Sequence, residues 1–132
     1  MKFLEKFLNF WQQDEMPELQ TPPQEKSRFL LVYKQLPIGA LEINEGVWKF
    51  NYSEEFRNQQ IIIPLMDFPN TSKVYESTNL WPFFSSRIPS TNSPAVGEIV
   101  KKKKLDAANP VDMLSEFGRR TITNPFELMG VS

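Results

Sequence analysis

The chain has 132 residues, a formal net charge of −1, and neither cysteine nor histidine. The absence of cysteine excludes disulfides, thiol nucleophiles and cysteine metal sites, and the absence of histidine removes the commonest metal ligand and neutral-pH acid–base group. The composition therefore counts against a metalloenzyme or a hydrolase. A near-zero net charge gives no global field toward nucleic acid or membrane, and the length fits one domain.

Residues 1–24 are predicted to form an N-terminal amphipathic helix and a linker. Apolar side chains recur there at helical spacing, at Phe3, Leu4, Phe7, Leu8 and Trp11. We expect this helix to dock on the chain's own sheet, with a partner protein and a membrane surface as the alternatives. A polar stretch with three prolines follows, so the compact domain is predicted over 25–132. The region lacks the uninterrupted apolar run of a secretory signal or a membrane span, which predicts a cytoplasmic protein.

The first part of this domain predicts an antiparallel meander over 28–33, 40–43 and 47–52. Pro37-Ile38-Gly39 is typical of a turn or bulge, and Glu45-Gly46 is typical of a tight hairpin. In the third segment Trp48, Phe50 and Tyr52 alternate with polar residues, which is the period of a half-buried strand. Ser53 is predicted to cap a short helical turn.

The second part predicts two short strands and two helices. The strands are Ile61-Ile62-Ile63, expected to be buried, and 73–76. The helices begin at Ser93-Pro94 and Asn109-Pro110, where a cap precedes a first-turn proline, and Gly118 is expected at the C′ position of the second. The predicted fold class is α+β, with a small antiparallel β-sheet or partial barrel, an N-terminal amphipathic helix and two C-terminal helices.

The segment 80–89, Leu-Trp-Pro-Phe-Phe-Ser-Ser-Arg-Ile-Pro, concentrates three aromatic rings and two prolines. Proline disfavours a core strand and is accepted in a helix only in the first turn, so we expect a short helical turn or loop at the edge of the fold. Phe83 and Phe84 are expected to pack in the core. Trp81 precedes a proline and follows a polar loop, so its ring is expected at the rim, where it can anchor a partner.

The charged residues show no spacing that is typical of a catalytic site. Lys101, Lys102, Lys103 and Lys104 are interpreted as a solvated helix end, with contact to phosphate or an acidic partner as the alternative. Arg119 and Arg120 are expected to satisfy the carbonyl groups at a helix end, with contact to a partner as the alternative. There is no Walker pattern, no G-x-G-x-x-G, no kinase catalytic loop and no nucleophile–base set. The sequence predicts a protein that is not an enzyme and has no catalytic, cofactor-binding or metal-binding residues.

Four short motifs follow one another along the chain in an order typical of one protein family. They are GALE at 39–42, WKFNYS at 48–53, IIIPLM at 61–66 and LWPFF at 80–84. This set resembles the N-terminal subdomain of HipA-type toxin kinases over residues 29–89. The tail FGRRTITNPFEL at 117–128 is similar to the ending of stand-alone versions, of which HipS in the tripartite HipB–HipS–HipT systems is one. Residues 85–90 replace the Leu-Leu-Pro-Glu-Gly-like run of the fused form, and the chain stops where a kinase body is expected to start.

The resemblance implies an antitoxin that binds and inhibits a HipT-like serine/threonine kinase. Trp81 is the expected anchor at or near the kinase active site, with Phe84, Ser85, Ser86 and Arg87 as its neighbours in the contact. The alternative is a structural subunit that bridges the kinase to a HipB-like DNA-binding repressor. Neither interpretation involves direct contact with nucleic acid or with a membrane.

Overall fold

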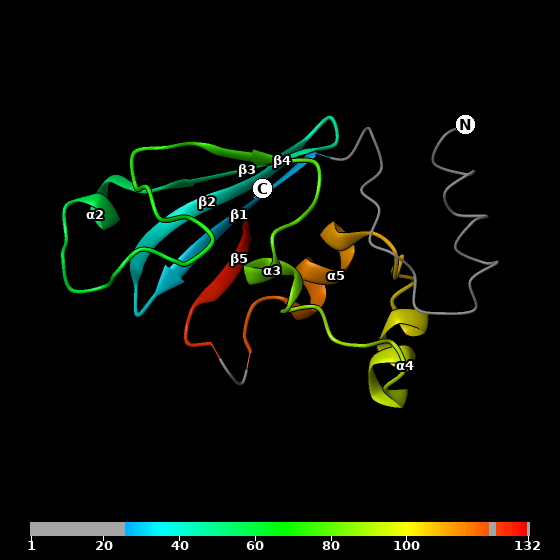
Figure 1. The fold of residues 1–132 in the computed structure, drawn as a ribbon. Helices are drawn as coiled ribbons and strands as arrows, with labels where there is room; N and C mark the ends of the chain where they lie inside the picture. The colour runs from blue at the N-terminus through cyan, green and yellow to red at the C-terminus, as the bar shows by residue number, and fades with distance from the viewer. Residues whose placement is uncertain (1–25, 122–123, 132) are drawn as a thin grey trace.

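The computed structural model describes residues 26–121 and 124–131, so the helix and linker predicted over 1–24 lie outside the described residues. The fold class is α+β, as the sequence predicts (Figure 1). In chain order its elements are β1 (Lys26–Tyr33), β2 (Leu36–Asn44), β3 (Val47–Tyr52), α2 (Glu54–Arg57), β4 (Tyr75–Ser77), α3 (Pro82–Ser85), α4 (Pro94–Lys102), α5 (Pro110–Phe117) and β5 (Glu127–Val131).

The strands form one open five-stranded sheet in the order β4-β3-β2-β1-β5, and every neighbouring pair is antiparallel. The meander predicted over 28–52 is confirmed as β1, β2 and β3, and the brief strand predicted at 73–76 is confirmed as β4, one or two residues later. The sequence analysis did not predict β5. This strand returns from the end of the described chain to the edge of the sheet and pairs with β1, with Leu128 opposite Leu31 (Figure 1).

Two-residue turns connect the three meander strands. Glu45 and Gly46 have φ values of 51° and 78°, which confirms the predicted hairpin and is the geometry of a type I′ turn. The first turn has the same geometry but is built from Lys34 and Gln35, with φ values of 46° and 72°. Pro37-Ile38-Gly39 forms a bulge, because Leu31 faces Gly39 while Val32 faces Pro37 and leaves Ile38 as the extra residue.

Replacing Gln35 with glycine is expected to raise the free energy of unfolding by about 1 kcal/mol, because a left-handed conformation costs a residue with a Cβ roughly that much. Gly46→Ala in the neighbouring turn is the matched control and is expected to lower stability. Urea unfolding at neutral pH measures both changes. A Gln35→Gly variant no more stable than the parent protein would show that the turn is not strained.

The hydrophobic core lies on one face of the sheet. Side chains that alternate along the strands point to this face, and the partner registers bring Phe29, Leu41 and Phe50 into one row. The alternation predicted for Trp48, Phe50 and Tyr52 is confirmed, since all three are fully buried. Helices α3 and α5 and the long loop between α2 and β4 cover the face (Figure 1).

The prediction of a buried strand at Ile61-Ile62-Ile63 is wrong. These residues form a loop, in which the side chains of Ile61 and Ile63 are 93% and 79% exposed. The amide groups of Ile61 and Ile62 donate to Oε1 of Gln59, at 2.9 and 2.8 Å. A side chain of the same loop therefore satisfies the N–H groups that a strand would offer to a neighbour.

Tyr52 ties the end of this loop to the sheet. Its hydroxyl donates to the carbonyl oxygen of Phe68 at 2.6 Å and accepts from the amide of Leu65 at 2.8 Å. Burial disfavours the phenolate and raises the pKa of Tyr52 from 10.0 to about 12. The neutral hydroxyl is thus the form that the folded state holds.

Tyr52→Phe is expected to cost about 1–2 kcal/mol of stability at neutral pH, because the two backbone groups lose their partner. The stability that the hydroxyl gives is complete below pH 10 and is lost as the pH rises from 10 toward 12, since the unfolded chain releases this proton first. Urea unfolding of both proteins at pH 8 and pH 11 isolates this residue, because all other titrating groups are common to the pair. The difference in free energy of unfolding between the two proteins should be smaller at pH 11 than at pH 8. An equal difference at both pH values would contradict the raised pKa of Tyr52.

Both predicted C-terminal helices are confirmed as α4 and α5, but two of their expected ends differ. Asn109 caps α5, accepting from the amide of Val111 at 2.9 Å, whereas the side chain of Ser93 makes no capping bond at α4. Gly118 is the C-cap residue of α5, with a right-handed φ of −82°, and not the C′ residue that was expected. Glycine is needed there because a Cβ would lie 2.7 Å from the carbonyl oxygen of Leu114. No helix within the described ranges is long and apolar enough to cross a membrane.

Candidate functional site

The aromatic segment forms a single helical turn, α3, which confirms the short turn predicted there. Trp81 is its N-cap residue, with extended backbone angles of −67° and 149°, and Pro82 occupies the first helical position. The carbonyl oxygen of Trp81 accepts from the amides of Phe84 and Ser85, both at 2.9 Å. The Trp-Pro dipeptide thus sets where the turn begins and how the Trp81 side chain leaves it.

A carboxylate from the long loop holds the start of this turn. Trp81 has no side-chain oxygen to cap the helix, and the amide of Phe83 donates instead to Oδ2 of Asp67, at 3.1 Å. The role of Asp67 was not predicted, because this residue lies sixteen positions before Phe83 and no local pattern links them. The contact fixes α3 against residues 65–68.

The Trp81 ring lies at the rim of an aromatic cluster and is partly buried. It packs edge-on against Phe68, with ring centroids 5.0 Å apart and an interplanar angle of 79°. Phe68 in turn stacks on Phe50 of β3 at 4.3 Å. The ring is therefore packed against the core cluster, and part of the residue stays accessible to a partner.

Two residues expected beside Trp81 in a partner contact are instead inside the protein. Phe84 is 0% exposed and packs against Phe50 and Phe68, because the turn points it at the sheet. Arg87 is only 4% exposed. The burial of Phe84 confirms its predicted core packing, and both side chains act in holding the turn in place. Buried side chains present little surface, so a contact of these two with a partner stays a prediction.

Arg87 joins three separate parts of the chain. Its Nη1 donates to the carbonyl oxygens of Gly118 and Arg119, at 2.8 and 3.4 Å, and its Nη2 donates to that of Phe126, at 2.8 Å. Removal of the guanidinium from water lowers the pKa of Arg87 from 12.5 to about 10. The group links the end of α3 to the end of α5 and to the start of β5.

The helix-end role that was predicted for Arg119 and Arg120 thus belongs to Arg87. Arg119 and Arg120 are exposed, and their side chains pair with Glu127 at 3.5 and 3.3 Å, respectively. What remains at the surface of the predicted site is the edge of Trp81, together with Pro82, Ser85 and Ser86. Ser85 is half-buried and Ser86 is exposed. This surface is small, uncharged and mostly apolar.

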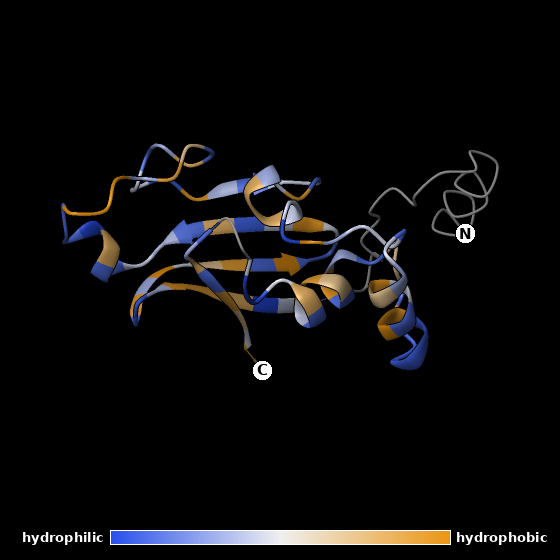
Figure 2. Cartoon of the chain, turned by 90° about the horizontal axis from the view of Figure 1, so that it is seen from below, coloured by the Kyte–Doolittle hydropathy of each residue, from blue (hydrophilic) through white to orange (hydrophobic). Residues whose placement is uncertain are grey.

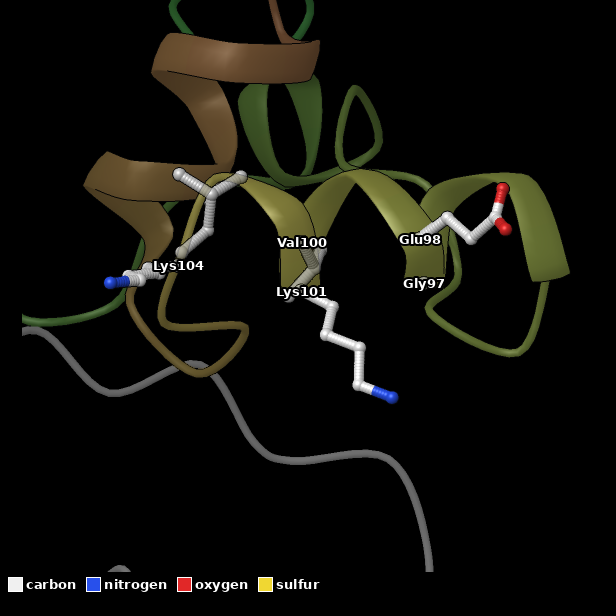
Figure 3. Close-up of a pocket in the computed structure, with 6 residues that line it drawn as sticks. Gly97, Glu98, Val100, Lys101 and Lys104 are labelled. Carbon is white, nitrogen blue, oxygen red and sulfur yellow. The ribbon is translucent and has the colours of Figure 1, made fainter.

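A shallow hollow of about 550 Å³ lies elsewhere, along α4 (Figure 3). Its labelled charged side chains, Glu98, Lys101 and Lys104, point away from one another, so no polar groups converge on a substrate (Figure 3). The lysine run at 101–104 is exposed, and within the described residues Lys103 pairs with Glu116 at 3.0 Å. Nowhere in the described ranges do three carboxylates gather in a group that could hold a metal ion.

Comparison with known proteins identifies the domain. Residues 30–123 match the HipA N-terminal domain, which is most of the chain and runs from the second half of β1 through α5, with the whole of the Trp81 turn. That domain is a non-catalytic part of HipA-type proteins, and it associates the chain with toxin–antitoxin systems. No curated protein matches the chain. The chain belongs to the HipA N-terminal domain family.

Proposed function

We propose that this protein is a non-enzymatic antitoxin that binds and inhibits a HipT-like serine/threonine kinase, with Trp81 as the anchor of the contact. The observation that supports this most directly is the way the Trp81 ring is held. Asp67 fixes the turn that carries it, and Phe68 packs against one side of it. A ring presented on a rigid base is the kind of residue that dominates protein interfaces.

The entropy of binding favours such a contact. A large aromatic side chain that is already fixed loses little conformational freedom when a partner closes around it, and it removes a large apolar area from water. Placed at or near the kinase active site, it would obstruct nucleotide or protein substrate, or hold the kinase away from its closed geometry. Inhibition then needs no catalytic group on this chain.

A bridging subunit between the kinase and a HipB-like DNA-binding repressor is the second candidate. The exposed lysine run at 101–104 favours it, because a cationic surface suits an acidic partner. The two candidates differ in whether this chain alone acts on the kinase. Both candidate functions require the protein to share a compartment with the kinase, which we propose is the cytoplasm.

The test is the activity of a purified HipA-type kinase lacking this domain, from the same organism, measured with and without this protein and with no repressor present. The antitoxin proposal expects phosphorylation to fall in proportion to the protein added, reaching a plateau at a fixed molar ratio. Binding without any loss of activity would favour the bridging subunit. Activity that is unchanged because no complex forms would contradict both.

A further inference from the structure

A second unusual surface lies in the loop after α2, which we call the apolar loop and define as residues 59–66. It presents large hydrophobic side chains to solvent: Ile61, Ile63 and Met66 are 93%, 79% and 96% exposed. In Figure 2 this loop shows as an orange stretch running from α2. Single exposed apolar residues are ordinary, but three large ones within six positions form a patch that marks an interaction site.

The loop is held in one conformation by side-chain hydrogen bonds. The Gln59 amide donates to the carbonyl oxygens of Phe56 and Ile62, at 3.2 and 2.9 Å, and accepts from two backbone amides of the loop. At the far end Leu65 is buried and the Tyr52 hydroxyl fixes its amide. The exposed side chains are therefore presented by a preorganised backbone, which lowers the entropy lost on binding.

The apolar loop is physically continuous with the Trp81 turn. Directly after Met66, Asp67 accepts the hydrogen bond from the amide of Phe83, and Phe68 packs against the Trp81 ring. The two surfaces thus share one support. The end of the apolar loop at Met66 therefore adjoins the support of the Trp81 turn, and the loop extends from there toward α2 (Figure 1).

Size argues for a joint surface as well. A stable protein interface removes roughly 800 Å² from water on each partner. The turn around Trp81 offers parts of two rings, those of Trp81 and Phe83, with a proline and two serines, because Phe84 and Arg87 are buried. The contact must therefore extend, and the apolar loop is the neighbouring apolar surface. The apolar loop carries no charged side chain, which fits an uncharged apolar depression on the partner.

We propose that the apolar loop is a second docking element for the same kinase, seated in an apolar depression on its surface beside the site that receives Trp81. This assignment rests on the proposed function, since it takes its occupant from it. The loop adds affinity and register through Ile61, Ile63 and Met66, while Trp81 supplies both the central contact and the inhibition. Removing the loop's apolar side chains should then weaken binding but leave full inhibition attainable at saturation.

The experiment replaces Ile61, Ile63 and Met66 together with serine and measures binding to the kinase by calorimetry. These side chains are exposed, so the variant should melt at the temperature of the parent protein while its dissociation constant rises at least about tenfold. Gln60→Ser, at an exposed polar position of the same loop, is the matched control and should bind like the parent. A photoreactive residue at position 63 should crosslink to the kinase.

Each contrary result has a separate meaning. If the parent protein binds the kinase and the triple variant binds equally well, the loop assignment is overturned and the proposed function stands. If the parent does not bind the kinase, both are overturned. If the parent instead self-associates in sedimentation, or binds lipid vesicles, and the triple variant loses that property while keeping its affinity for the kinase, the loop's occupant is a second copy or a membrane and the proposal is wrong.

Discussion

Arg87→Met is expected to lower the free energy of unfolding by about 3 kcal/mol, because the buried carbonyl oxygen of Gly118 and the partly buried one of Phe126 lose a charged donor. Arg87 donates to Gly118 and Phe126 at 2.8 Å each, and both acceptors lie at junctions between elements far apart in sequence. Methionine fills much of the same volume, so the loss reports hydrogen bonding more than a cavity. Urea unfolding of the two proteins measures it.

Two controls locate the cause of this effect. Arg119→Met removes an exposed arginine that pairs with Glu127 at the surface and should change stability by less than about 0.5 kcal/mol. Arg87→Lys keeps the charge but loses the planar fork that reaches separate carbonyls, so it should recover only part of the stability. A methionine variant as stable as the parent would mean that Arg87 is not what joins α3, α5 and β5.

Trp81→Ala is expected to weaken kinase binding by at least about 30-fold, since truncating a central aromatic anchor commonly costs 2 kcal/mol or more. The loss of stability should be smaller, because the ring is only partly buried and rests on Phe68 along one edge. Binding calorimetry and inhibition of the kinase, measured on the same preparations, separate the two effects. Inhibition at saturation should also fall, which distinguishes Trp81 from the apolar loop.

Trp81→Phe provides the matched control for this variant. It keeps a ring against Phe68 and the same turn before Pro82, but it shortens the part that reaches outward. We expect affinity between those of the parent and the alanine variant. If alanine at this position binds and inhibits like the parent protein, Trp81 has no part in the mechanism.

Local patterns predicted the parts of this fold whose partners lie close in sequence. The alternation of Trp48, Phe50 and Tyr52 describes one face of β3, and that face is buried as expected. The cap at Asn109 and the hairpin at Glu45-Gly46 were predictable for the same reason, since each depends on neighbours within a few residues. The Trp-Pro pair likewise placed the start of α3.

The features that escaped the sequence analysis depend on distant residues. Arg87 reads as a surface charge beside two serines, and only the return of β5 brings the carbonyl of Phe126 to it, 39 positions later. Asp67 and Phe83 meet across sixteen positions. Three consecutive isoleucines favour a strand by propensity, but the Gln59 side chain takes the amides of Ile61 and Ile62 and no strand forms.

The most direct test of the account is whether this protein and a HipA-type kinase lacking its own N-terminal domain form a complex in solution. Light scattering on a gel-filtration column reads the mass of a mixture of the two purified proteins. The account predicts a single species of defined stoichiometry, which disappears at the same concentrations when Trp81 is alanine. Two separate peaks at concentrations well above the micromolar range would contradict it.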